Sequence, residues 1–222
     1  MLKVVFGFLL FTSVSFAEGG ATTAGDGGQG VICKAKNFSS RNQIGYSHTV
    51  ELLDLFEARR QFSDESWSFS NSVVGRQDFY FRNFKNSVCK ILSSKQRRLK
   101  RLGYQADTLK AFEEACDLAD RMRFKSKIPI TADFGQVAVP LPSNCQIFQL
   151  GYRVKVNGHD EVWINETLAQ YLNESELAAI LLHEALHPYL NESNLNSGVR
   201  KFVALAFAPH KLQVKLLADS QR

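Results

Sequence analysis

Residues 173–187 read Asn173-Glu174-Ser175-Glu176-Leu177-Ala178-Ala179-Ile180-Leu181-Leu182-His183-Glu184-Ala185-Leu186-His187. Asn173 is a favoured helix N-cap, and Glu176, three residues later, completes the spacing of a capping box. The helix that follows is apolar on nearly every side, which is typical of a helix buried among other elements. The stretch therefore predicts a buried central helix around which the rest of the domain packs.

A β-hairpin is predicted shortly before this helix. Residues 147–155 and 161–164 look like strands, and Asn157-Gly158 between them tolerates the positive φ angles of a tight hairpin turn. A short helix is expected over residues 166–172. A last, mainly apolar helix is expected over residues 198–208.

Helical periodicity also marks three earlier segments, residues 49–62, 77–101 and 107–123. The second and third are joined by a short connection near Gly103 and should pack as an antiparallel helical hairpin. We expect a loop over residues 63–75, a strand at 31–35 and an irregular crossing over 128–145. The predicted fold is α+β, mainly α, with a helical hairpin and a β-hairpin beside the central helix.

The start of the chain predicts export. Lys3 precedes an apolar run, and the small residues Ser15 and Ala17 stand where a signal peptidase would cut, so residues 1–17 read as a signal peptide. The run is too short for a stable transmembrane helix, and no later stretch is long enough. We expect a periplasmic or extracellular protein with a flexible Gly-rich segment at 18–30, one domain at 31–222 and no transmembrane span in the mature chain.

The four cysteines predict two disulfides, because an even count in an exported chain favours pairing. Cys89 and Cys116 lie at nearly equal distances from the turn of the helical hairpin, which places them at the same level. Of the three possible connectivities, this favours Cys89–Cys116, and Cys33–Cys145 follows by elimination.

A basic segment ends the first helix of the hairpin, and the chain carries a formal net charge of +5. We expect residues 121–127, which are also basic, to lie near it if the hairpin folds back. Two interpretations stay open: a patch for an anionic envelope component or acidic protein, or a solvated helix end whose cations suit the helix dipole. No aromatic residues are interleaved for base stacking, which argues against nucleic acid. The segment consists of Lys95, Arg97, Arg98, Lys100 and Arg101.

The central helix carries a possible metal site. His183 and His187 are four residues apart and so share one helix face, where two imidazoles can chelate one metal ion. Glu184 lies beside them. A zinc ion held in this way would acidify a water molecule, and Glu184 would move the water's proton to a leaving amine.

This motif, with the hairpin before it, resembles the zincin-type metallopeptidases. The resemblance implies His183 and His187 as Zn²⁺ ligands, Glu184 as the catalytic general base, a peptide or protein substrate, and a zincin-like central helix. A second resemblance covers more of the chain and links it to a group of exported bacterial proteins, which brings no established activity. It is carried by the Gly-rich start before Cys33, by Val50-Glu51-Leu52-Leu53-Asp54-Leu55 and by Leu182-His183-Glu184-Ala185-Leu186.

The chain departs from the zincin pattern after the second histidine. Pro188 removes the helical hydrogen bond to the carbonyl of Glu184 and should bend or end the helix. Leu190 and Ser193 stand where the long form of the motif has Gly and His, and no Glu follows Glu192 for the other form.

The third metal ligand has three candidates. His210 ranks first, because the last helix could fold back onto the central one and His210 comes just after it. Glu192 and Asp219 are the alternatives.

A second interpretation needs no metal. His183 and Glu184 would then be hydrogen-bonded core residues, and Arg200, at the start of the last helix, would be the candidate partner that a buried glutamate requires. The chain would be a non-enzymatic exported protein with a degenerate zincin-like site, binding an envelope component or another partner.

Overall fold

The computed structural model describes residues 28–38, 44–62, 84–104, 106–128, 139–190, 195–209 and 213. Within these ranges the chain forms six α-helices and two three-stranded sheets, so the fold is α+β and mainly α, as predicted. The predicted signal peptide, residues 18–27 and the predicted loop at 63–75 lie outside the described residues. No helix among the described residues is long and apolar enough to cross a membrane.

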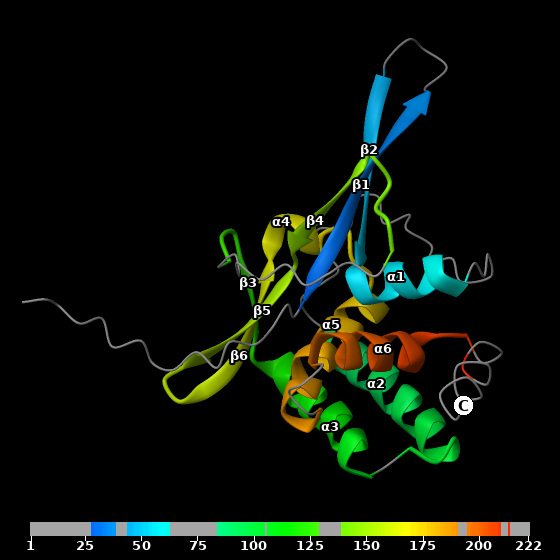
Figure 1. Ribbon diagram of the computed structural model, residues 1–222. Helices are drawn as coiled ribbons and strands as arrows, with labels where there is room; N and C mark the ends of the chain where they lie inside the picture. Colours follow the sequence, from blue (N-terminus) through cyan, green and yellow to red (C-terminus); the bar gives the residue numbers. More distant parts are fainter. Residues whose placement is uncertain are drawn as a thin grey trace, which may run out of the picture.

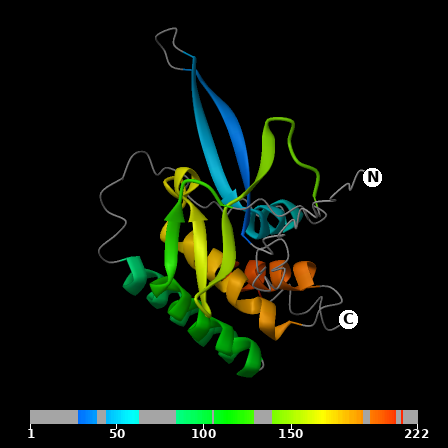
Figure 2. The same cartoon turned by 90° about the vertical axis from the view of Figure 1, so that its left-hand side faces the viewer.

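The first sheet is antiparallel and has the strand order β2-β1-β4. Strands β1 (Gln29–Phe38) and β2 (Ile44–Leu52) form a long ribbon that projects from the rest of the molecule (Figures 1 and 2). Strand β4 (Cys145–Gln149) pairs with the base of this ribbon.

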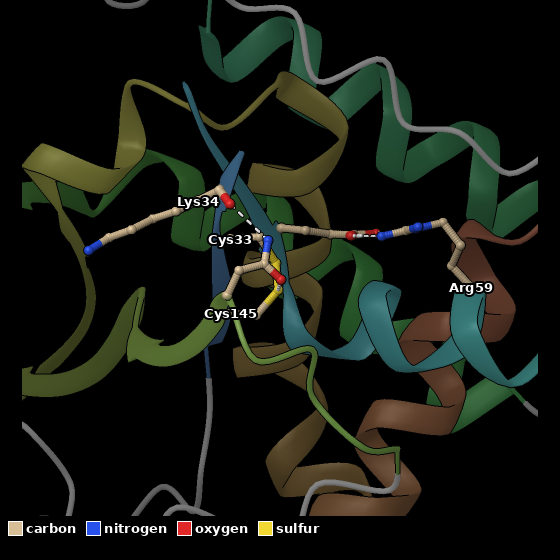
Figure 3. Close-up of a disulfide and its surroundings, with 6 residues drawn as sticks. Cys33, Lys34, Arg59 and Cys145 are labelled. Carbon is tan, nitrogen blue, oxygen red and sulfur yellow. Dashed lines mark hydrogen bonds and ion pairs between the residues drawn. A yellow bond between two sulfur atoms is a disulfide. The ribbon is translucent and has the colours of Figure 1, made fainter. Parts of the chain in front are cut away.

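A disulfide joins β1 to β4, because the register places Cys33 opposite Cys145 (Figure 3). Beside it, the side-chain amide of Asn144 donates a hydrogen bond to the carbonyl of Lys34 at 2.8 Å. The predicted Cys33–Cys145 pairing is confirmed. The bond links β1 covalently to β4 at this position of the sheet.

The second sheet has the order β3-β6-β5, with β3 (Met122–Lys125) parallel to β6 (His159–Asn165) and β5 (Gly151–Val156) antiparallel to it. The turn between β5 and β6 is the predicted hairpin. Asn157 and Gly158 have φ angles of 50° and 82°, the left-handed conformation that these two residue types adopt most readily.

The helical hairpin is confirmed as well. Helices α2 (Phe84–Arg101) and α3 (Ala106–Asp120) pack together, and a disulfide links Cys89 to Cys116 as predicted. Gly103 in the connection has a φ of +85°, as expected of a glycine just after a helix. The other helices are α1 (Leu53–Phe62), α4 (Glu166–Ala169), α5 (Glu174–Leu186) and α6 (Leu195–Phe207).

Helix α5 is the buried central helix that the sequence predicts. It lies in the middle of the molecule, with β5 and β6 to its left in Figure 1, α1 to its right and α2 and α3 below. Every residue from Glu176 to Leu186 is buried. Both bonds of the predicted capping box are present, and the α-helix ends at Leu186, where a 3₁₀ turn containing Pro188 begins.

In three places a long-range strand pairing overrides the local pattern, and the predicted boundary is wrong. The predicted helix at 49–62 begins only at Leu53, since residues 49–52 complete β2 against β1. The helix predicted to end near 123 stops at Asp120, because residues 122–125 pair with β6. The strand predicted at 147–155 breaks at Leu150 into β4 and β5, which belong to different sheets.

The last residues of the Gly-rich segment belong to the folded domain, and their hydrogen bonds explain the break of the strand at Leu150. The carbonyl of Gly28 accepts hydrogen bonds from the backbone N–H groups of Leu150 and Gly151, at 2.7 and 2.8 Å. Gly28 has a φ of +67°, and a Cβ there would lie 2.8 Å from the Cα of Gly151, so only glycine fits. Residues 28–30, expected to be flexible, therefore pack tightly at the junction of the two sheets.

Glu176 makes the stability of the fold depend on pH. Burial raises the pKa of this carboxyl to about 8, although the N–H of Asn173 donates to it and acts against the rise. The folded protein thus holds a proton that the unfolded chain loses near pH 4.5, so stability should fall by a few kcal/mol as the pH rises from 4.5 to about 8. Urea unfolding of Glu176→Gln at several pH values should show a clearly smaller fall. An unchanged fall would contradict the assignment.

Candidate functional site

The two histidines of the motif lie together at the C-terminal end of α5. Their ring centroids are 5.2 Å apart, as the four-residue spacing predicts. The side chain of His183 is 1 % exposed and the Glu184 residue is fully buried, whereas His187 is half-buried. The motif is thus held inside the core, with His187 on the side nearest to solvent.

Asp54 orients the first histidine. This residue lies in the first turn of α1, and its Oδ2 atom is 2.6 Å from Nδ1 of His183, with both side chains almost fully buried. Burial acts to lower the pKa of His183, but the charge and hydrogen bond of Asp54 outweigh it and raise the pKa. Because a carboxylate only accepts, Nδ1 donates this bond and Nε2 is left as the atom that can bind a metal.

Four other side-chain atoms of the motif have no hydrogen-bond partner among the described residues. Nε2 of His183, Nε2 of His187 and both carboxylate oxygens of Glu184 are buried without a hydrogen bond to any described residue. Burial raises the pKa of Glu184 to about 7, and burial together with the charges of His183 and Arg153 lowers the pKa of His187 to about 3. Four unpartnered buried atoms on these side chains are costly, and a metal ion bound by the two imidazole nitrogens would give those nitrogens a partner.

The structure agrees with the interpretation without a metal for His183 but not for Glu184. His183 is hydrogen-bonded in the core through Nδ1, as that interpretation expects. Arg200, however, pairs with Glu57 at 3.5 Å and donates to Gln29 at 3.3 Å, and Glu184 has no hydrogen bond from it. Arg200 is therefore not hydrogen-bonded to Glu184 as that interpretation expects.

The described residues contain no candidate cluster of three metal ligands. No group of three or more His, Cys, Asp or Glu side chains that could hold one metal ion occurs in the part of the chain that the structure describes. His210, Glu192 and Asp219 lie outside that part.

Two residues of the basic segment make contacts within the fold. The Nζ atom of Lys95 lies 5.1 Å from the ring centroid of Phe207, and Arg98 donates to the carbonyl of Ala208 at 3.4 Å, so both hold the end of α6. The three other cations, Arg97, Lys100 and Arg101, are exposed. An anionic partner for them stays a prediction.

The second basic stretch lies at the other end of the helical hairpin. Lys85 in the first turn of α2 forms an ion pair with Asp120, the last residue of α3. Residues 121–127 follow Asp120 directly and therefore lie far from 95–101. The expectation that the two stretches are neighbours is wrong.

Comparisons of the chain with protein-family models, with curated proteins and with solved structures gave no match. The site must therefore be judged from its own residues. Two that sequence reasoning missed are Asp54 and Arg153, the latter bound to the carbonyl of Glu184. Asp54 had a visible signal, since two apolar residues stand on each side of it and a carboxylate in such surroundings needs a partner.

Proposed function

We propose that this protein is an exported zinc-dependent hydrolase, and within that class a peptidase. The observation that supports this most directly is the set of buried, unpartnered atoms on His183, Glu184 and His187, in a motif whose first histidine is oriented by Asp54. Their chemistry fits Zn²⁺, which prefers imidazole nitrogen and is commonly held by histidines that bind a carboxylate through the other ring nitrogen.

His183 and His187 would hold the ion through their Nε2 atoms, with His210 as the first candidate for a third ligand and Glu192 or Asp219 as alternatives. When bound, zinc supplies Lewis acidity to the attacking water and to the substrate carbonyl.

Glu184 would act as the general base. It accepts a proton as the water oxygen bonds to the amide carbon, and it passes that proton to the amine nitrogen as the C–N bond breaks. The products are a carboxylic acid and an amine, so atoms and charge balance. The closed, apolar surroundings of Glu184 would strengthen its interactions with the reacting groups.

Export is supported by the predicted signal peptide together with the disulfides. All four cysteines are paired, none is free, and such bonds persist in oxidising compartments. We therefore place the activity in the periplasm or outside the cell.

Metal content tests the proposal. Purified wild type, saturated with zinc and dialysed, should retain about one zinc per chain, whereas His183→Ala and His187→Ala should retain almost none. The exposed His159, at the start of β6, provides the matched control, and His159→Ala should bind zinc as the wild type does. A wild type that takes up no zinc would contradict the proposal.

Peptide cleavage tests the class of reaction. Glu184→Gln should keep its zinc and cleave a peptide library at least about 100-fold more slowly than the wild type, since it cannot take up the water's proton. Cleavage products are read by mass spectrometry. Zinc-loaded wild type that cleaves no peptide would contradict the peptidase assignment while leaving the metal site in place.

A further inference from the structure

The carbonyl of Glu184 has lost its helical partner. In an α-helix the carbonyl of residue i accepts the N–H of residue i+4, which for Glu184 is residue 188. That residue is Pro188, which has no N–H, and the α-helix gives way here to the 3₁₀ turn His187–Tyr189. A carbonyl at a buried residue needs another donor.

Arg153 is that donor. It lies on β5, and its Nη1 atom donates to the carbonyl oxygen of Glu184 at 2.8 Å. The side chain is 15 % exposed, so it makes this bond largely away from water. A residue of the β-hairpin thus completes the hydrogen bonding of the helix that carries the motif.

The same guanidinium is held from two further elements. Its Nη2 atom lies 2.8 Å from Oε1 of Glu114 on α3 and 2.8 Å from Oδ2 of Asp160 on β6. Burial acts to lower the pKa of Arg153, but these two carboxylates raise it, so the group stays charged. Arginine can make all three contacts because its donors form a planar fork, which a lysine ammonium does not offer.

We propose that Arg153 is a positioning residue of the site, which takes the place of the donor that Pro188 removes and fixes the last turn of α5 against the hairpin β5–β6. Glu184 and His187 lie at this turn, so their placement relative to His183 depends on the contact. This consequence for metal binding rests on the proposed function. The contact itself does not.

A double-mutant cycle between positions 153 and 188 tests the contact. Arg153→Met keeps the aliphatic stem but removes the donor, and Pro188→Ala restores a backbone N–H four residues after Glu184. Arg153→Met should raise the unfolding equilibrium constant about tenfold more in the wild-type background than in the Pro188→Ala background. Equal effects in both backgrounds, measured by urea unfolding, would overturn the proposal.

Metal affinity tests the positioning. Zinc binding, measured by competition with a chelator, should weaken at least about tenfold in Arg153→Met and recover in Arg153→Met/Pro188→Ala. The visible spectrum of bound Co²⁺ should change and recover in parallel, which a loss of stability alone would not produce. Arg123→Met is the control, because Arg123 is exposed on β3 and its contacts lie away from α5. Its guanidinium donates to the carbonyls of Asp120 and Met122, at 3.4 and 3.1 Å, and lies 3.9 Å from Glu161.

The outcomes separate the two proposals. The positioning role is supported if positions 153 and 188 are coupled in stability and if zinc affinity falls in Arg153→Met and recovers in Arg153→Met/Pro188→Ala. Coupling with unchanged zinc affinity overturns that role. If the wild type binds neither zinc nor cobalt, the proposed function and the positioning role both fail, while the stability cycle still decides whether Arg153 replaces the helical donor.

Discussion

Replacing Cys33 and Cys145 together by serine should lower the free energy of unfolding by about 5 kcal/mol, the loop-closure entropy expected for a bond of this span. The two cysteines are 112 residues apart in sequence, so their disulfide removes many conformations from the unfolded chain. Because the whole free energy of unfolding of a domain is only about 5–15 kcal/mol, the variant should be close to unfolding at room temperature. Urea unfolding without reductant measures the change.

The second disulfide provides the matched control. Cys89 and Cys116 are 27 residues apart, and the same relation gives about 3.5 kcal/mol for replacing both by serine. The first double variant should therefore be the less stable of the two. It also loses the bond that holds β4 on the base of β1, beside the strand that leads to α1. A Cys33/Cys145 variant as stable as the Cys89/Cys116 variant would contradict this account.

Features set by neighbouring residues could be predicted from the sequence. The capping box, the end of the α-helix before Pro188 and the turn at Asn157-Gly158 each depend on a few adjacent residues, and all are present. The disulfide pairing followed from one local fact, the short connection of the helical hairpin. The spacing of His183 and His187 likewise follows from helix geometry alone.

Features set by distant pairing could not be predicted. The apolar run around Val50 and Leu52 is compatible with a helix or a strand. Its pairing with β1 makes it a strand. Strand β3 exists because it pairs with β6 about 40 residues later, and its short sequence has no signal of its own. The contact of Asp54 with His183 spans 129 residues. The sequence therefore indicated that Asp54 needs a partner, but it did not indicate that the partner is His183.

Asp54 should matter to metal binding although it would not touch the metal. Its hydrogen bond fixes which nitrogen of His183 faces the unpartnered atoms and increases the basicity of that nitrogen. Asp54→Leu should weaken zinc binding about 100-fold, and Asp54→Asn about tenfold, since its amide oxygen can still accept the bond without a charge. Competition with a chelator, on samples shown to be folded by circular dichroism, measures both.

Glu57 separates this effect from a general loss of stability. It lies on the same helix, is also buried, and pairs with Arg200 instead of His183. Glu57→Gln should therefore lower the melting temperature yet leave the zinc affinity of the folded protein unchanged. Saturating zinc should raise the melting temperature of the wild type and of Glu57→Gln by similar amounts, and that of Asp54→Leu by much less. Were zinc to stabilise Asp54→Leu as strongly as the wild type, Asp54 would be only a partner of a core histidine, with no part in a metal site.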